Sequence, residues 1–292
     1  MTRIYTQIAS GGSSTADLVD PLRDAILRTS LGSVWTGDLV QINMGYSTPD
    51  DLFKKSAEEI LEHAPNHPES LQTQYVRDGQ EIKTAGFRGI ARSAIEKAVK
   101  PVGMFINFED RKRDDGQPTF DDARRRITPA EVELVGRCRA VAVSEVFTAA
   151  DKAIPISVWN TPINPFHEDV NWDHVRETHD ALGLDYAILN GYRDQGSHRE
   201  NAEYIAGATH LMSKELPGTR IIVALSPSTQ GRVFSPLSIV TLLHKLYAID
   251  RAECDVLLWM NAAWSSADQN KQSIKDFAEV VGSFVASRGR RI

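Results

Sequence analysis

Short runs of apolar residues alternate along the chain with longer segments in which apolar residues recur every three or four positions. The pattern is clearest after residue 150. There the apolar runs cover 154–162, 184–192, 220–228 and 254–262. The segments with helical spacing cover 171–183, 198–218, 235–250 and 271–288. Near-continuous apolar strands that alternate with helices are typical of a parallel sheet covered by helices, so the pattern predicts an α/β fold.

The first part of the chain follows the same rhythm less regularly. Its predicted strands cover 2–10, 33–44, 70–77 and 102–110. Its predicted helices cover 15–30, 49–64, 81–100 and 128–152, the last with Thr128 and Glu131 as a capping box. Eight strand–helix pairs in 292 residues are what a closed (β/α)8 barrel needs. The sequence therefore predicts a TIM-type (β/α)8 barrel, with residues 1–292 as a single domain.

An open, doubly wound sheet is the alternative architecture. Such sheets often carry G-x-G-x-x-G or G-x-x-x-x-G-K-[ST] after a strand, and neither motif occurs here. The segment GGSS at 11–14 follows the first predicted strand, and a bare Gly/Ser cluster of this kind is ordinary turn chemistry. The barrel is therefore the favoured prediction.

Composition narrows the classes of partner. The net charge of −6 and the absence of a basic cluster argue against a nucleic acid or an anionic membrane surface. No apolar segment is long enough to span a membrane, and no signal peptide is visible, so a cytoplasmic protein is expected, although a secreted mature form would look the same. Cys138 and Cys254 are too few for a disulfide framework and lack zinc-ligand spacing. The oligomeric state stays open.

Polar and aromatic residues gather at the ends of the predicted strands, where a barrel places its active site. Aromatic rings and amides outnumber charges there. No pair of histidines with metal-ligand spacing occurs at these ends, and the local acidic loop at 167–169 is the single place that resembles one, so we predict no metal and no cofactor. The candidates are Gln41, Asn43, Tyr46, Asn107, Glu109, Asp110, Trp159, Asn160, Asn190, Tyr192, Asp194, Trp259, Asn261 and Trp264.

A rim of aromatic and amide side chains around one or two carboxylates is typical of a sugar-binding site. The apolar faces of sugars stack on indole rings, and amides bind ring hydroxyls. Glycoside hydrolysis also needs a carboxylic acid and a second group that meets the developing oxocarbenium ion. Glu109 is the candidate acid. A salt bridge to Arg111 or Arg113 is the structural alternative for Glu109, and barrel packing is the alternative for each aromatic residue.

The segment VGMFINFE at 102–109 resembles the D-G-x-D-x-D-x-E motif of chitinase-type barrels. Gly103 and Glu109 match, whereas the three Asp positions hold Val102, Phe105 and Asn107. Residues 106–110 are also similar to the I-D-W-E pattern of hyaluronidase-type barrels. The resemblance implies a glycoside hydrolase that acts on an N-acetylated or uronic-acid-containing glycan. It implies Glu109 as general acid, Tyr192 from the strand at 184–192, and Trp259 as the floor of the sugar subsite.

Asn107 is the important departure from both patterns. In those families the Asp at this position holds the substrate acetamido group and tunes the acid. Asn107 can donate a hydrogen bond but cannot carry a negative charge, so Asp110 or a distant carboxylate would have to be the second group. A barrel that binds a carbohydrate or a protein surface without cleavage is therefore one alternative.

Another barrel enzyme, such as a lyase or a phosphate-binding isomerase, is a further alternative. Barrel enzymes of that kind often hold phosphate after the seventh and eighth strands. The loop at 226–232 carries several potential donors there, namely Ser226, Ser228, Thr229 and Arg232.

Overall fold

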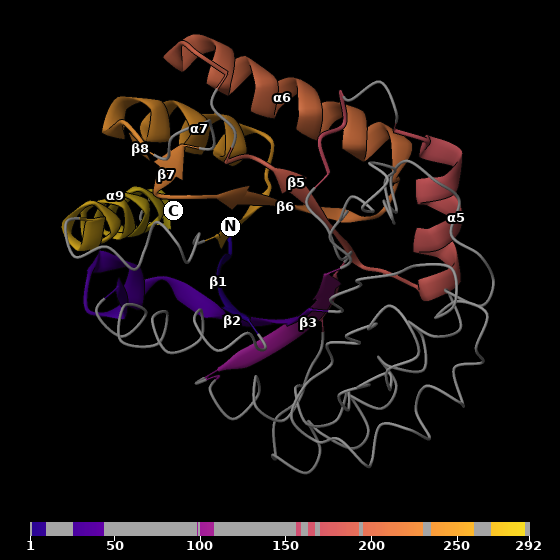
Figure 1. The fold of residues 1–292 in the computed structure, drawn as a ribbon, viewed down its shortest axis with the longest axis horizontal. Coiled ribbons are helices and arrows are strands. Elements are labelled where there is room, and N and C mark those ends of the chain that lie inside the picture. Colours follow the sequence, from indigo (N-terminus) through magenta and orange to yellow (C-terminus); the bar gives the residue numbers. More distant parts are fainter. Residues whose placement is uncertain are drawn as a thin grey trace, which may run out of the picture.

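Among the described residues, seven parallel strands pair in sequence around a closed ring (Figure 1). The last strand pairs with the sixth on one side and with the first on the other, which closes the ring. The strands are β1 (Ile4–Ala9), β2 (Trp35–Asn43), β3 (Pro101–Asn107), β4 (Ile156–Val158), β5 (Tyr186–Asn190), β6 (Arg220–Leu225) and β9 (Asp255–Leu258). The computed structural model describes residues 2–9, 26–43, 98, 100–107, 156–158, 163–166, 170–192, 195–229, 235–259 and 270–289.

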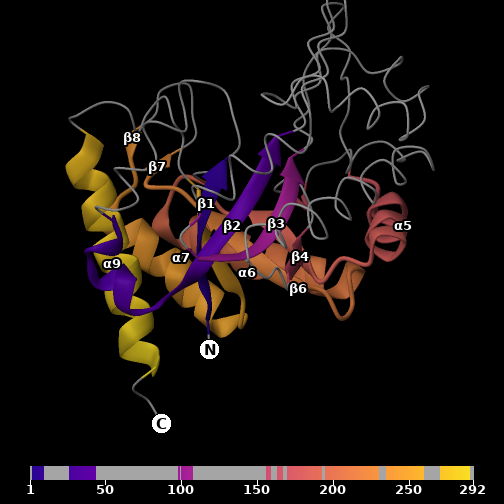
Figure 2. The ribbon, with the colours of Figure 1, turned by 90° about the horizontal axis from the view of Figure 1, so that it is seen from below.

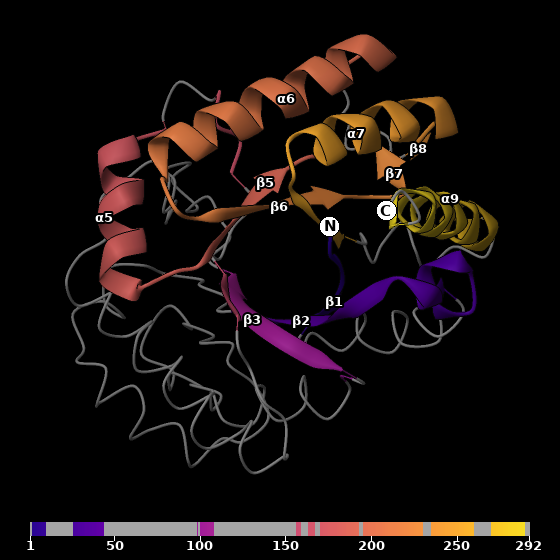
Figure 3. The same cartoon turned by 180° about the vertical axis from the view of Figure 1, so that it is seen from behind.

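The described helices lie outside the ring (Figures 1 and 3). They are α5 (Trp172–Leu182), α6 (His198–Glu215), α7 (Ile239–Arg251) and α9 (Lys271–Gly289), with a short 3-10 helix, η1 (Ser30–Ser33). A small antiparallel pair, β7 (Ser228–Thr229) and β8 (Ser235–Pro236), stands apart from the ring. None of the helices in the described ranges is long and apolar enough to cross a membrane.

The α/β class and the order of elements after residue 150 are confirmed. Each of the four apolar runs there contains a strand, and each helical segment contains a helix. In the first part of the chain, β1 and β2 lie within the predicted strands, and β3 overlaps the prediction at 102–110 but begins one residue earlier. The predicted strand at 70–77 and the predicted helices at 49–64 and 128–152 lie outside the described residues, as do most of those at 15–30 and 81–100.

The predicted order of eight barrel strands is wrong at one point. β2 and β3 pair directly in parallel, from Asp38 with Pro101 to Asn43 with Asn107. No strand can therefore lie between β2 and β3, which is the place that the (β/α)8 prediction gave to 70–77. An apolar run alone does not reveal which strands become neighbours, because strand pairing depends on contacts between distant parts of the chain.

Alternate side chains of each strand point to opposite faces of the sheet, and both faces are buried. The inward-facing side chains form one cluster with Tyr5, Leu39, Ile188, Ile222 and Leu257. The outward-facing neighbours, such as Ile4, Leu189 and Val256, pack with helical residues in a second cluster. Burial on both faces explains why the strands are near-continuous apolar runs in the sequence.

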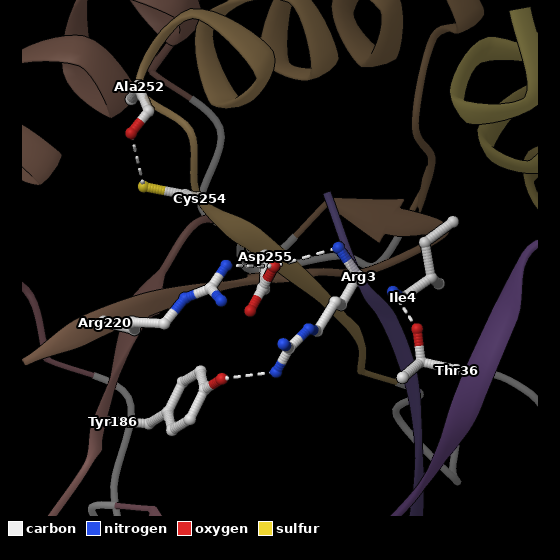
Figure 4. A network of polar contacts seen from close by, with 8 residues as sticks. All are labelled: Arg3, Ile4, Thr36, Tyr186, Arg220, Ala252, Cys254 and Asp255. Atoms are coloured by element: carbon white, nitrogen blue, oxygen red, sulfur yellow. Dashed lines mark hydrogen bonds and ion pairs between the residues drawn. The ribbon is translucent and has the colours of Figure 1, made fainter. Parts of the chain in front are cut away.

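The amino end of the ring is closed by a polar network (Figure 4). Asp255, the fully buried first residue of β9, accepts hydrogen bonds through Oδ1 from the Arg3 N–H at 2.9 Å and from the Arg220 guanidinium at 3.0 Å. The Arg3 guanidinium in turn donates to the Tyr186 hydroxyl at 3.0 Å. Burial raises the pKa of Asp255, while the Arg3 N–H and the two guanidinium groups act against this rise. The network joins Arg3, the residue before β1, to β5, β6 and β9 at this end.

Candidate functional site

The parallel strands run in one direction, so their carboxyl ends meet at one edge of the ring (Figure 2). Two predicted aromatic residues, Tyr192 after β5 and Trp259 after β9, come together there. Their ring centroids are 5.9 Å apart and their planes differ by 19°. Both are partly exposed, and both pack against the interior cluster. Since β6 lies between β5 and β9, the pair bridges that strand with an offset aromatic stack at the mouth of the ring.

Asn190, the last residue of β5, belongs to the inward-facing series of that strand. Tyr186 and Ile188 lie in the interior cluster, whereas Leu189 packs with the helices. The Asn190 side chain is 4% exposed, and its Oδ1 has no hydrogen-bond partner among the described residues. A buried acceptor without a partner costs about 1–3 kcal/mol. The carboxyl end of the interior therefore holds a polar atom that fold stability does not explain.

The backbone around Asn190 is held firmly from outside the ring. Its N–H donates to the Ile163 carbonyl at 2.9 Å, and its carbonyl accepts the Tyr204 hydroxyl of α6 at 3.0 Å. At Gly191, an added Cβ would collide with the Val223 side chain and the Ala224 carbonyl, so only glycine lets the chain pass this close to β6. These contacts fix the direction in which the neighbouring Tyr192 leaves the strand.

Lys245 of α7 adds a further support that the sequence did not suggest. The side chain is 1% exposed, and its Nζ donates to the Gly191 carbonyl at 2.8 Å. The sequence held one signal that Lys245 is buried. Position 245 lies on the same helix face as Leu242, Leu246 and Ile249, which are all buried.

The predicted phosphate donors after β6 are partly engaged with one another. The hydroxyl oxygens of Ser226 and Ser228 are buried and 3.1 Å apart, and the Ser228 N–H donates to the Ser226 hydroxyl. Thr229 pairs with Ser235 in the small β7–β8 sheet, and Arg232 lies outside the described residues. The two serines thus form a local turn, and a phosphate site here stays a prediction.

β2 and β3 bring two predicted residues next to each other. The register pairs Asn43 with Asn107, and Gln41 with Phe105, near the carboxyl ends of the two strands. In the described part of the chain, no group of three or more His, Cys, Asp or Glu residues is arranged to hold a metal ion. The other predicted site residues lie outside the described residues: Tyr46, Glu109, Asp110, Trp159, Asn160, Asp194, Asn261 and Trp264.

Cys254 is a buried free thiol. Burial, followed by the nearby Asp255 carboxylate, raises its pKa to about 12. A thiol with so high a pKa is a poor nucleophile at neutral pH. Cys254 is therefore a packing residue, and Cys138 lies outside the described residues.

Comparison with known proteins found similarity in solved structures only. No family model and no curated protein matches the chain. The bee venom hyaluronidase structure is 11% identical, with 84% of this chain and 72% of that chain covered and a TM-score of 0.41. A family 18 chitinase from Crocus vernus is 11% identical, with 97% of this chain and 99% of that chain covered and a TM-score of 0.46. A fungal β-1,4-galactanase is 8% identical, with 94% of this chain and 87% of that chain covered and a TM-score of 0.45. All three TM-scores are below 0.5, so these similarities support no conclusion about this chain.

Proposed function

We propose that this chain is a glycan-binding barrel of the glycoside hydrolase type, with Tyr192 and Trp259 as the platform on which a sugar ring stacks. The observation that carries the proposal is their stacked, partly exposed arrangement at the carboxyl end of the ring. Flat aromatic rings beside buried amide groups suit a pyranose, which has an apolar face and a polar edge. The proposal treats residues 1–292 as one barrel domain.

Glu109 is the proposed general acid. It follows the last residue of β3 by two positions, and β3 ends at the same edge of the ring as the aromatic pair. The second group would be Asp110 or the acetamido group of an N-acetylated substrate. The proposed substrate is an N-acetylated or uronic-acid-containing glycan, and the remaining predicted residues at the strand ends would line its path.

The test separates binding from cleavage. Calorimetric titration with a panel of oligosaccharides should show binding by the unchanged protein, and Trp259→Ala should weaken it about ten- to a hundredfold. Glu109→Gln should keep the binding and lower the turnover of aryl glycosides about 10²- to 10⁴-fold. Unchanged turnover in this variant would rule out Glu109 as the acid. Failure of the unchanged protein to bind any glycan would overturn the proposal as a whole.

A carbohydrate-binding barrel without catalysis is the second candidate. Asn107 favours it, because a neutral amide stands where the related motifs carry an aspartate. This candidate predicts glycan binding with no hydrolysis at any pH. Asn107→Asp is then the informative variant, because gained turnover with unchanged binding would show that the amide alone limits the chemistry.

A further inference from the structure

The carboxyl end of the inner wall, below Tyr192 and Trp259, carries the Asn190 amide beside the apolar residues Ile188, Ala224 and Leu257. Asn190 pairs in register with Ala224 of β6, and Ala224 pairs with Leu257 of β9. Trp259 follows Leu257 by two residues, so it continues the same inward-facing series. Asn190 and Trp259 thus flank the strand that carries Ala224, whose side chain is a single methyl group. The amide and the aromatic stack face the same part of the interior.

The Asn190 side chain interrupts the inward-facing series of β5 with an amide whose Oδ1 has no partner among the described residues, as the buried Tyr5 hydroxyl also has none. Its inward-facing predecessors, Tyr186 and Ile188, continue a packed apolar cluster. A leucine at this position would extend that cluster and leave no buried acceptor unsatisfied. The backbone bonds of Asn190 to Ile163 and Tyr204 do not require an amide side chain. Buried polar groups that lack a partner call for a specific explanation, and a binding role is one of those.

We infer that Asn190 is a specificity-determining residue of the sugar subsite, and that its Oδ1 accepts a hydrogen bond from a neutral sugar held on the aromatic pair. This inference rests on the proposed function and deepens it. The matching ligand group is a hydrogen-bond donor, either a hydroxyl or an amide N–H. The subsite therefore takes a neutral sugar, and any uronic acid of the glycan lies at another position.

The chemistry around Oδ1 disfavours an anionic group. A carboxylate has only acceptor oxygens, so it would face Oδ1 with no proton between them. The described interior neighbours Ile188, Ala224 and Leu257 are apolar and offer no cation to offset the charge. A site built to accept from a donor also discriminates strongly against a ligand that lacks one. Through Oδ1, Asn190 thus favours a ligand that presents a hydrogen-bond donor.

The inference is tested by the preference between two sugars, which a purely structural residue would not change. Calorimetry would compare an N-acetylglucosamine tetramer with an oligosaccharide of the same length made only of uronic acids. We expect the unchanged protein to bind the neutral tetramer more tightly. Asn190→Leu should weaken that binding about tenfold or more and reduce the preference, while its Tm stays the same or rises. Asn190→Asp keeps the shape and the acceptor, so it should still bind the neutral sugar and reject the uronic acid more strongly.

The outcomes separate this inference from the proposed function. If the unchanged protein binds a saccharide, Trp259→Ala weakens it, and both Asn190 variants keep the original preference, the inference alone is overturned. A preference of the unchanged protein for the uronic acid would also overturn it. If neither sugar nor any other saccharide binds, the proposed function and the inference fail together. Should Asn190→Leu not fold, the preference shown by Asn190→Asp decides.

Discussion

The two ends of the barrel interior use polar residues in different ways. At the amino end, Asp255 Oδ1 receives hydrogen bonds from Arg3 and Arg220, so the carboxylate is paired with a cation although its Oδ2 has no partner among the described residues. At the carboxyl end, Asn190 presents an acceptor with no partner in the described part of the chain, and Tyr192 and Trp259 are partly exposed. The first arrangement ties strands together, whereas the second leaves binding capacity unused.

Under the proposed function, the difference would separate stability from binding within one sheet. In barrels, residues at the amino ends of the strands serve mainly stability, and residues at the carboxyl ends serve chemistry. Here the burial of charge at the amino end is offset by opposite charge. At the carboxyl end, the aromatic rings of Tyr192 and Trp259 stay partly exposed. Substitutions at the amino end should therefore change mainly the free energy of unfolding, whereas substitutions at the carboxyl end should change glycan affinity.

The largest expected effect comes from the amino end. Asp255→Ala removes the shared acceptor of Arg3 and Arg220, and it should lower the free energy of unfolding by about 3 kcal/mol in urea titrations. The value lies at the lower end for a buried pair because the Arg220 side chain is 42% exposed. Glycan affinity of the folded protein should not change. Asp255→Asn is the matched control, since it keeps one acceptor oxygen and should cost less.

A loss of glycan affinity in folded Asp255→Ala would show that the amino end also contributes to binding. A loss of stability below about 1 kcal/mol would mean that the network contributes no more than an exposed ion pair.

His179 lies in α5, away from both ends of the ring, and it should make the stability of the protein depend on pH. It is 4% exposed, and burial lowers its pKa to about 4 from the ordinary 6.5. Between pH 6.5 and 4 the unfolded chain binds a proton that the folded protein excludes, so stability is complete above pH 6.5 and declines as the pH falls. The total loss by pH 4 should be roughly 3 kcal/mol. Urea titrations at several pH values measure it.

The variant His179→Leu should flatten this part of the pH profile, whereas substitution of the exposed His210 by Gln should leave it unchanged. An equally steep profile in His179→Leu would assign the acid sensitivity to other groups. The pair of variants also shows whether glycan binding at low pH is lost through unfolding or through the site itself.

Lys245→Met tests the support of the carboxyl end. Removal of the Nζ donor leaves the Gly191 carbonyl without this bond, and the free energy of unfolding should fall by about 2 kcal/mol. Glycan binding should weaken as well, because Gly191 lies between Asn190 and Tyr192. The exposed Lys214 of α6, substituted in the same way, is the control and should change neither quantity. Weakened stability with intact binding would limit Lys245 to a structural role.

The smallest expected effect belongs to the start of α6. Ser197 and Glu200 form a reciprocal capping box there. Ser197→Ala should lower the free energy of unfolding by about 1 kcal/mol and leave glycan affinity unchanged. Ser213→Ala, on an exposed position of the same helix, should have almost no effect on urea unfolding. A reduced affinity in Ser197→Ala would extend the functional end of the barrel into α6.

Local patterns predicted much of the fold. The apolar runs identified the strands, and the rule that barrel strands end at the active face made Asn190, Tyr192 and Trp259 site candidates, a role that stays a prediction. The direct pairing of β2 with β3 was missed, because periodicity carries no information about neighbours. The bond between Arg3 and Asp255 was missed for the same reason, since 252 positions separate them. The missing partner of Asn190 Oδ1 became visible only once its surroundings were known.

The closure of the ring has a consequence for how the chain reaches its native state. β1 acquires its second neighbour only when β9 exists, because Ile4 pairs with Val256. A nascent chain that has not yet emerged beyond β6 has two open strand edges, one on β1 and one on β6. Strands that must pair with distant segments form their pairings slowly. Until the partner strand is present, their open edges are prone to aggregation. Expression should therefore depend on how quickly the segment from α7 to β9 emerges and docks, and slowing translation just before β9 should reduce the soluble yield.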